Sequence, residues 1–323
     1  MNLLLSNIRQ KLYLNKRKFY RLSGQFLQKI FWEKNIDNLY YGHYNILKRY
    51  TNSYLPYKIN GELQHGWHGT NGMTCPPHLH SELQKTKRYY LWNARNIEHS
   101  IKDGYQNVIA LGAPFIYMKR LKIDKQNNGG LILFPLHAQD YYSFKNPVII
   151  YKNYINELKK IKNQFKFITV SLYWYEYQNN KIISMFNDEG FKVITMGHRD
   201  NNIEFLYKFR NIVMEHEYLS SDSFGSAIFY GLFLKRKTFL YGSSMYKDLD
   251  VPEIWNTEKK FENYSVHYNN LFCKTYPQLI WENFNDEIHF DIGIEELGYE
   301  NKKSKKELRE IFGWKLKNIF MSF

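Results

Sequence analysis

The chain has 323 residues, and a single hydrophobic core usually stops growing near ~250 residues, so we expect two compact domains. Hydrophobic residues make up 44% and charged residues 24% of the chain, close to globular averages, which argues against a disordered or fibrous protein. A formal net charge of +14 predicts attraction to the phosphates of nucleotides, nucleic acids or anionic lipids. The only cysteines, Cys75 and Cys273, exclude a disulfide framework and, with no CxxC pair, a zinc site, which fits a reducing compartment.

Between residues 6 and 35, Lys and Arg alternate with Leu, Phe, Tyr and Ile at roughly helical spacing. The pattern predicts one or two basic amphipathic helices, which either dock on a core or lie on an anionic membrane face. No stretch approaches the ~18 uncharged apolar residues of a membrane span, and the apolar run at the start is too short for a signal peptide. We therefore expect a cytoplasmic protein, with peripheral contact to the inner membrane face as one use of this segment.

Short apolar runs bounded by turn residues alternate with helical patterns along the rest of the chain. The strand signals are Val108–Met118, Gly130–Leu136, Phe165–Trp174, Phe191–Met196 and Thr238–Tyr241. The helical patterns between them are Tyr151–Gln164, Lys181–Glu189 and Ile203–Val213. Strands that alternate with helices predict parallel sheets in an α/β fold, with ligands at the carboxyl ends of the strands.

The polar cluster DKQNNGG, from Asp124 to Gly130, separates two strand signals and predicts the interdomain linker. We expect an N-terminal α/β domain over residues 1–126 and a second α/β domain over 127–290 that binds the ligand. A helical tail over 291–323 should pack back on one of them.

The stretch from Glu215 to Gly242 predicts a strand that ends near Tyr218, a turn rich in Ser and Gly, an apolar helix over Ala227–Leu234 and a further strand. Backbone N–H groups and hydroxyls at a helix N-terminus suit a phosphate. A single serine would indicate only an N-cap, but four within seven residues around a glycine favour a phosphate site. The residues of this predicted site are Ser220, Ser221, Ser223, Gly225 and Ser226.

Two other strand signals are followed by polar side chains. His198 and Arg199 come after one, and His137 and Asp140 come after another. Residues at such positions border the ligand site of a doubly wound sheet. A solvated loop histidine at His198 and a helix cap at Asp140 are the plain structural alternatives.

The segment GELQHGWHGTNGMTCPP places His65, Trp67 and His68 among several glycines. Glycines let a backbone approach a ligand closely, and a histidine can act as a general base near neutral pH. The spacing of the two histidines also allows a metal pair, but no carboxylate cluster or third histidine at helical spacing supports one. We therefore expect a catalytic or substrate-binding loop.

Several of these stretches resemble motifs of one enzyme group. The serine turn with its helix and basic turn resembles the C-terminal-domain signature of GT-B bacterial envelope enzymes. It is similar to the Ser-Ser motif of bacterial sialyltransferases and polysialyltransferases, and to the Asp-Tyr-Ser-Ser motif of teichoic-acid polymerases that use CDP-glycerol. The Asp-Tyr is missing here, and Arg236 and Lys237 stand where Lys-Pro is common. His198 resembles the histidine of the sialyltransferase His-Pro motif, with Arg199 in place of the proline.

The resemblance implies a GT-B-like fold, with two Rossmann-like doubly wound domains facing a cleft. It implies a glycosyltransferase of capsule or O-antigen type that uses a nucleotide-sugar donor, a glycan or lipid-linked acceptor and no cofactor. The donor would be bound by the serine turn with His137, His198 and Arg199, and the acceptor side would be lined by Trp67, Trp92 and Asn93. The catalytic candidates are His65, His68, Asp140 and His198.

Asp248 and Asp250 have the DxD spacing of metal-dependent GT-A enzymes, but they fall in a late loop, so we expect no metal. No GxxxxGK[ST] or GxGxxG motif is present. The serine signature equally allows a CDP-alditol phosphotransferase of teichoic-acid type. An aromatic content of 18% and the positive charge allow a nucleic-acid-binding protein. The basic residues are spread along the chain without a known binding module, so we expect no nucleic-acid partner.

Overall fold

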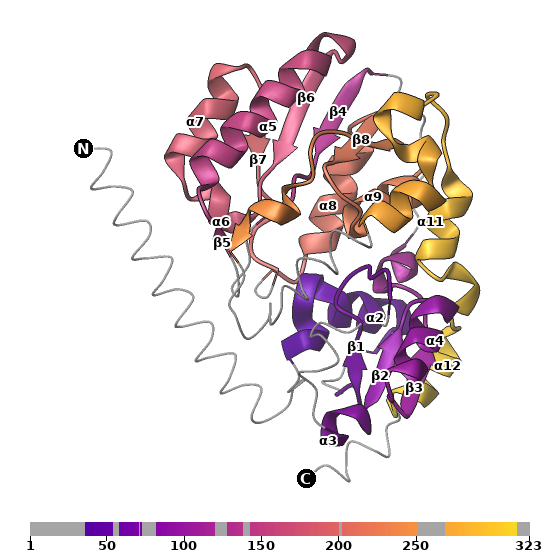
Figure 1. The fold of residues 1–323 in the computed structure, drawn as a ribbon. Helices are drawn as coiled ribbons and strands as arrows, with labels where there is room; N and C mark the ends of the chain where they lie inside the picture. The colour runs from indigo at the N-terminus through magenta and orange to yellow at the C-terminus, as the bar shows by residue number, and fades with distance from the viewer. Residues whose placement is uncertain are drawn as a thin grey trace.

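A computed structural model describes residues 36–53, 58–70, 72, 82–119, 128–137, 143–199, 202–250 and 269–314. The predicted basic helices of residues 6–35 and Asp140 lie outside these ranges. The described chain forms two main parallel sheets surrounded by helices (Figure 1). The α/β class predicted from the alternation of strand and helix signals is confirmed.

The larger sheet has five parallel strands in the order β7-β6-β4-β8-β9. They are β4 (Gly130–Leu133), β6 (Phe167–Ser171), β7 (Lys192–Ile194), β8 (Tyr218–Ser221) and β9 (Lys237–Leu240). The first of these strands in the chain lies at the centre, the next two are added on one side and the last two on the other. This is the doubly wound order, and it places a ligand site at the carboxyl ends near β4 and β8, where the order reverses.

Strand β4 shows how the sequence covers both faces of this sheet. Leu131 and Leu133 pack in one buried cluster with α5 (Pro147–Ile161) and α7 (Asn180–Asp188). Ile132 packs in another with α8 (Phe205–Met214) and α9 (Ser226–Phe233). Successive side chains of a strand point to opposite faces, so a continuous apolar run is what a strand between two helical layers requires.

The smaller sheet holds three parallel strands in chain order, β1 (Glu62–Leu63), β2 (Arg88–Leu91) and β3 (Asn107–Ala110). Within the described residues the strand order of this smaller sheet does not reverse. Of the two sheets, the larger one therefore shows the doubly wound order. Helix α4 (Ala94–Lys102) connects β2 to β3, with Asn93 as its N-cap. Helix α2 (His43–Thr51) and the short α3 (Glu82–Lys85) complete this part.

The C-terminal segment contacts both sheets. Helix α11 (Phe290–Glu296) packs on α9 so closely that a Cβ on Gly293 would lie 2.6 Å from the backbone nitrogen of Phe233. Helix α12 (Lys305–Ile311) then packs against α2, as the yellow end of the ribbon shows in Figure 1. Trp314 fixes this return because its indole Nε1 donates to the carbonyl of Lys58 at 2.7 Å.

The short elements complete the chain. Helix α6 spans Trp174–Tyr177, and strands β5 (Ser143–Phe144) and β10 (Leu249–Asp250) pair antiparallel. The 3₁₀ helices are η1 (Ile36–Gly42), η3 (Pro114–Tyr117), η4 (Lys162–Gln164), η5 (Met245–Asp248), η7 (Pro277–Leu279), η8 (Trp281–Asn283) and η9 (Tyr299–Asn301).

Some sequence-based boundaries are wrong. The run Val108–Met118 is a strand only as far as Ala110, and Pro114 begins the 3₁₀ helix η3 within it. The strand expected to end near Tyr218 begins there and runs to Ser221, which pairs with Leu240 of β9. Hydroxyl residues were expected in a turn, but Ser220 and Ser221 are buried in a parallel ladder.

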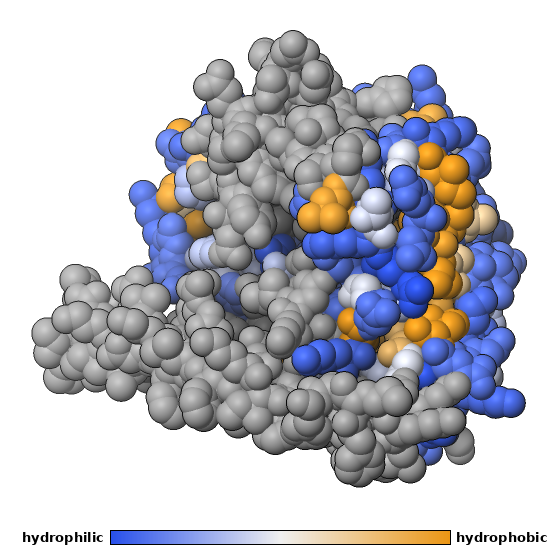
Figure 2. Space-filling model, turned by 90° about the horizontal axis from the view of Figure 1, so that it is seen from below, coloured by the Kyte–Doolittle hydropathy of each residue, from blue (hydrophilic) through white to orange (hydrophobic). Residues whose placement is uncertain are grey.

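A single buried cluster contains side chains from both sheets, among them Tyr90 and Trp92 from the smaller sheet side and Leu219 and Phe229 from the larger. None of the described helices has the length and apolar character needed to cross a membrane. On the face seen from below, the described surface is mainly hydrophilic, and hydrophobic residues gather in a band along one side (Figure 2).

Candidate functional site

Polar side chains that follow strands of both sheets meet at one place. His65 comes two residues after β1, and Arg199 comes five residues after β7. The Nη1 atom of Arg199 lies 3.3 Å from Nε2 of His65, although 134 residues separate them in the chain. The carboxyl ends of β1 and β7, one strand from each sheet, therefore face a common site.

This site is rich in nitrogen bases and positive charge. Burial, and then the charge of Arg199 and the nearby imidazoles of His43, His68 and His137, lowers the pKa of His65 well below its ordinary value. Burial also lowers the pKa of His68 to about 4 and that of His43 to about 3. At neutral pH the imidazoles of His43, His65 and His68 are therefore uncharged, and Arg199 supplies a fixed positive charge. We call these five residues the histidine–arginine cluster.

The tautomer of His65 follows from its neighbour. A guanidinium can only donate, so Nε2 of His65 must accept from Arg199 and the ring proton must reside on Nδ1. Nδ1 of His65 is buried and has no hydrogen-bond partner among the described residues. The cluster thus presents an unsatisfied donor beside a cation, an arrangement that suits an anionic oxygen.

Aromatic side chains surround the cluster and hold it in place. The guanidinium carbon of Arg199 lies 4.7 Å from the ring centre of Tyr40, and its carbonyl accepts from the backbone N–H of Tyr41 at 2.8 Å. The rings of His137 and Tyr173 lie 4.3 Å apart. Arg199 is only 2% exposed, so its cation–π contact and its contact with His65 are made in a desolvated environment.

His198 lies beside this cluster, and its ring contacts that of Trp174 at 4.9 Å. It is 2% exposed, so the alternative of a solvated loop histidine is wrong. Its part in donor binding stays a prediction.

The loop of residues 64–70, which carries His65 and His68, is anchored at one end to the segment after β2 and at the other to helix α4. Oε1 of Gln64 accepts from the backbone N–H of Trp92 at 2.8 Å, and Nε2 of Gln64 donates to the carbonyl of Gly66 at 2.8 Å. At the other end, Nδ2 of Asn96 donates to the carbonyls of His68, at 3.0 Å, and Thr70. These amide side chains give the glycine-containing loop a fixed course.

The serine turn divides into two parts. The hydroxyl of Ser221 donates to the carbonyl of Phe134 at 2.7 Å, and Ser220 is fully buried, so both belong to the sheet interior. Gly225 is the N-cap of α9. Among the described residues, no side chain caps this helix, and a Cβ on Gly225 would meet no atom within 4 Å. Ser226 is the first residue of the helix, and Ser223, three residues earlier, is 4% exposed. The open space at the start of α9 is where the helix N-terminus offers its N–H groups.

Asp222 lies between these serines and was not singled out from the sequence. Its carboxylate accepts from the backbone N–H of Leu136 at 2.6 Å and of Met245 at 3.1 Å. Burial raises its pKa to about 6. Asp222 ties the segment after β4, which carries His137, to the segment after β9. A lone acid in a serine run at a strand end is the sequence signal that marks it.

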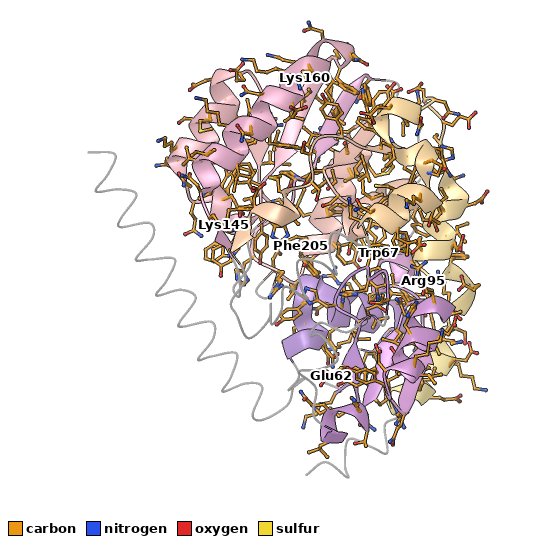
Figure 3. All side chains as sticks on the ribbon, in the orientation of Figure 1. Glu62, Trp67, Arg95, Lys145, Lys160 and Phe205 are labelled. Atoms are coloured by element: carbon orange, nitrogen blue, oxygen red, sulfur yellow. The ribbon has the colours of Figure 1, made fainter. Side chains whose placement is uncertain are left out.

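The residues expected on the acceptor side have structural partners. Trp92 is 1% exposed, and Asn93 caps α4 while its Nδ2 donates to the carbonyl of Glu296 at 3.1 Å. Trp67 packs its ring on Phe229 at 4.6 Å and lies between the two sheets beside Arg95, as Figure 3 shows. An acceptor role for these three residues stays a prediction.

Asp140 lies outside the described residues, so its relation to the site stays a prediction. Within the described ranges, no group of three or more His, Cys, Asp or Glu side chains has the arrangement of a metal site.

No protein-family model matches the chain, and no curated protein matches it in sequence. Among solved structures, a mutant of S. aureus TarM in complex with fondaparinux, α-GlcNAc-glycerol and UDP is similar, with a TM-score of 0.35 and 12% identity over 69% of this chain and 42% of that chain. The pneumococcal O-GlcNAc transferase GtfA in complex with UDP and GlcNAc gives a TM-score of 0.33 and 9% identity over 69% and 44%. This chain thus matches less than half the length of either protein. At these scores, neither likeness decides the activity, which is argued from the site.

Proposed function

We propose that the chain is a GT-B-type glycosyltransferase, which transfers a sugar from a nucleotide-activated donor to a bacterial surface glycan without a divalent metal. The observation that carries the proposal is the contact between His65 and Arg199, which joins the carboxyl ends of strands from two parallel sheets. A donor of this class carries a diphosphate or phosphate, and its leaving group gains negative charge during transfer. Fixed donors and a buried cation at that point stabilise such charge.

The donor phosphate would lie between the start of α9 and Arg199. The uncapped helix end at Gly225 and Ser226 offers N–H groups, and Arg199 offers a desolvated guanidinium. His137, which follows β4, and His198, which follows β7, would complete the donor side. Ser220 and Ser221 would support this site through the sheet, since the structure buries both of their side chains.

His68 would accept the proton of the acceptor hydroxyl, with Asp140 as the alternative. His65 could serve as the base only after Arg199 releases its Nε2, because that nitrogen carries the only lone pair of the neutral ring available to accept a proton. A base must be uncharged before it accepts a proton, and burial keeps both imidazoles neutral at pH 7. A low pKa makes a weak base, but an anion bound beside the ring favours the protonated form and raises the pKa. Binding of the donor would therefore raise the pKa of the imidazole and make it a stronger base.

The nature of the acceptor rests on the sequence resemblance alone. A surface glycan or its lipid-linked precursor would be met at the inner face of the cytoplasmic membrane. Peripheral attachment through the basic segment of residues 6–35 belongs to the same proposal.

A thermal-shift panel of CMP, CDP, UDP and GDP in the presence of EDTA tests the donor class. A ligand that binds only the folded state at 100 times its Kd stabilises that state by about 2.7 kcal/mol. We expect one nucleotide to raise the Tm, and Arg199→Gln to weaken its affinity about tenfold or more, because a hydrogen bond to a charged group is worth about 1.5 to 3 kcal/mol. Arg49→Gln is the matched control, since Arg49 is an exposed arginine whose side chain pairs with Glu204.

The possible results separate the alternatives. No shift with any nucleotide would remove the proposal. A CDP-specific shift with release of CMP in turnover would indicate the alditol phosphotransferase. Loss of transfer in EDTA, reproduced by Asp248→Ala, would show that the metal-independent mechanism is wrong.

A further inference from the structure

Glu296 is a fully buried carboxylate that receives donors from three separate segments. Arg95 of α4 donates through Nη1 to Oε1 at 2.7 Å and through Nη2 to Oε2. Tyr276 donates its hydroxyl to Oε1 at 2.6 Å. The indole Nε1 of Trp67 donates to Oε2 at 2.6 Å across a sequence separation of 229 residues. The side chain of Glu296 is 0% exposed, so these donors replace water.

Trp67 is also held at its backbone. Its N–H donates to Oγ of Ser226, the first residue of α9, at 2.8 Å. Gly66 comes so close to the same hydroxyl that a Cβ there would lie 3.0 Å from it. One residue of the loop 64–70 is therefore attached to α9 through its backbone and to α11 through its side chain.

We propose that Trp67 and Glu296 form a latch that positions the loop 64–70 against the larger sheet, and so sets His65 against Arg199. The inference rests on the proposed function for its consequence, because the latch matters to catalysis only if the cluster binds an anion. Trp67 lies between His65 and His68 in the chain. A displacement of Trp67 therefore moves both histidines, whereas Gln64 and Asn96 attach the loop only to the segment after β2 and to α4. Trp67 and Glu296 are positioning residues, with no direct contact to the reacting groups in this proposal.

The geometry explains why a tryptophan stands in a loop of glycines. Its ring is packed between Phe229, at 4.6 Å, and Phe272, at 4.8 Å, so the indole direction is fixed before the hydrogen bond forms. Arg95 neutralises Glu296 and also lies over Phe272, with its guanidinium carbon 4.9 Å from the ring centre. The carboxylate is thus aimed by its ion pair, and the indole by its packing.

Trp67→Phe tests the latch because it deletes the indole N–H and keeps an aromatic ring. Trp314→Phe is the matched control, since it removes an indole N–H of the tail that donates at 2.7 Å to the carbonyl of Lys58, a residue outside the loop 64–70. Hydrogen exchange of the folded, full-length proteins is followed by mass spectrometry. We expect exchange in residues 64–70 to become at least tenfold faster in Trp67→Phe and to stay at the parent rate in Trp314→Phe.

The second readout is the affinity for inorganic pyrophosphate, measured by calorimetry. We expect a Kd at least fivefold weaker in Trp67→Phe and unchanged in Trp314→Phe at a comparable loss of Tm. Unchanged exchange in residues 64–70, or an equal increase in both variants, would overturn the latch. Faster exchange with unchanged pyrophosphate affinity would overturn its positioning role. If the parent bound neither pyrophosphate nor any nucleotide, the proposed function would fail, and the exchange data alone would still decide whether the latch exists.

Discussion

His43 is the most deeply buried member of the histidine–arginine cluster, and neither of its ring nitrogens has a hydrogen-bond partner among the described residues. Such a group is tolerated only while it is neutral, because a buried charge without a partner is costly. Asp222, in contrast, is a buried polar group whose hydrogen-bonding atoms have partners. Its carboxylate is also buried, but it accepts two backbone N–H groups. At the scale of single residues, the site is therefore built from polar groups whose charge state the fold controls.

The burial of His43 predicts a loss of stability in acid. The unfolded imidazole titrates near 6.5, whereas burial lowers the folded pKa to about 3. Between these values the unfolded chain binds more protons, so the free energy of unfolding falls as the pH drops below 6.5. This group alone contributes roughly 2 kcal/mol between pH 6.5 and 5, at about 1.4 kcal/mol per pH unit. Urea unfolding at pH 7.5 and 5.0 should show a smaller difference for His43→Leu than for the parent. Equal differences would contradict the assignment.

Helix α9 is the element that most directly links fold to function. Its N-terminus has a glycine cap without a side chain, where an added Cβ would meet no atom of the described residues within 4 Å. It lies at the carboxyl end of β8, beside the strand-order reversal. A hydroxyl or carboxylate side chain at the N-cap would make the helix more stable than glycine does, because it would accept from the free N–H groups of the first turn. A glycine there leaves the N–H groups available to a ligand.

Gly225→Asp and Gly225→Ser separate stability from binding at this helix end. Both side chains are favoured N-caps, and the extended backbone of Gly225 accepts either, so the Tm should stay level or rise. Asp adds a negative charge where the donor phosphate is proposed to lie, and like charges in contact cost several kcal/mol. Nucleotide titration should show at least about tenfold weaker binding for Gly225→Asp than for Gly225→Ser. Equal affinities would place the phosphate elsewhere.

At the scale of the whole molecule, the two sheets are joined by packing as well as by the chain. One buried cluster holds side chains of both, and the C-terminal segment crosses from α9 back to α2. The crossing depends on Gly298, which has a φ of 63° and whose added Cβ would lie 1.9 Å from the carbonyl oxygen of Trp92. We therefore expect the halves to unfold together.

Gly298→Ala tests this coupling, with Gly190→Ala as its control. Both glycines have left-handed backbones, so each alanine carries a strain of about 1 to 2 kcal/mol. The Cβ at Gly190 meets only the flexible end of Lys162 at 3.3 Å, whereas the one at Gly298 meets backbone. Gly298→Ala should therefore lower the urea midpoint further, and the parent should show one transition by calorimetry and by fluorescence. Two separate transitions would show that the sheets fold independently.

Local sequence patterns predicted the α/β class and the positions of β3, β4, β6, β7 and β9, because apolar runs and turn residues act over a few neighbouring positions. Strand signals also preceded His137, His198 and Arg199, since a strand end is a local feature, whereas His65 was recognised only as part of a glycine-containing loop. The end of β8 was misplaced because serines are common in turns, and only pairing with β9 shows that Ser220 and Ser221 belong to the strand.

Only the tertiary structure decided which strand ends meet. The contact of His65 with Arg199 spans 134 residues and that of Trp67 with Glu296 spans 229, and no local pattern specifies such pairs. Packing of two sheets through a shared core brings them together, and the same packing makes a desolvated cation of Arg199 and a buried carboxylate of Glu296. The charge state and the partners of a side chain depend on its distances to other groups, and these distances are set only when the chain folds.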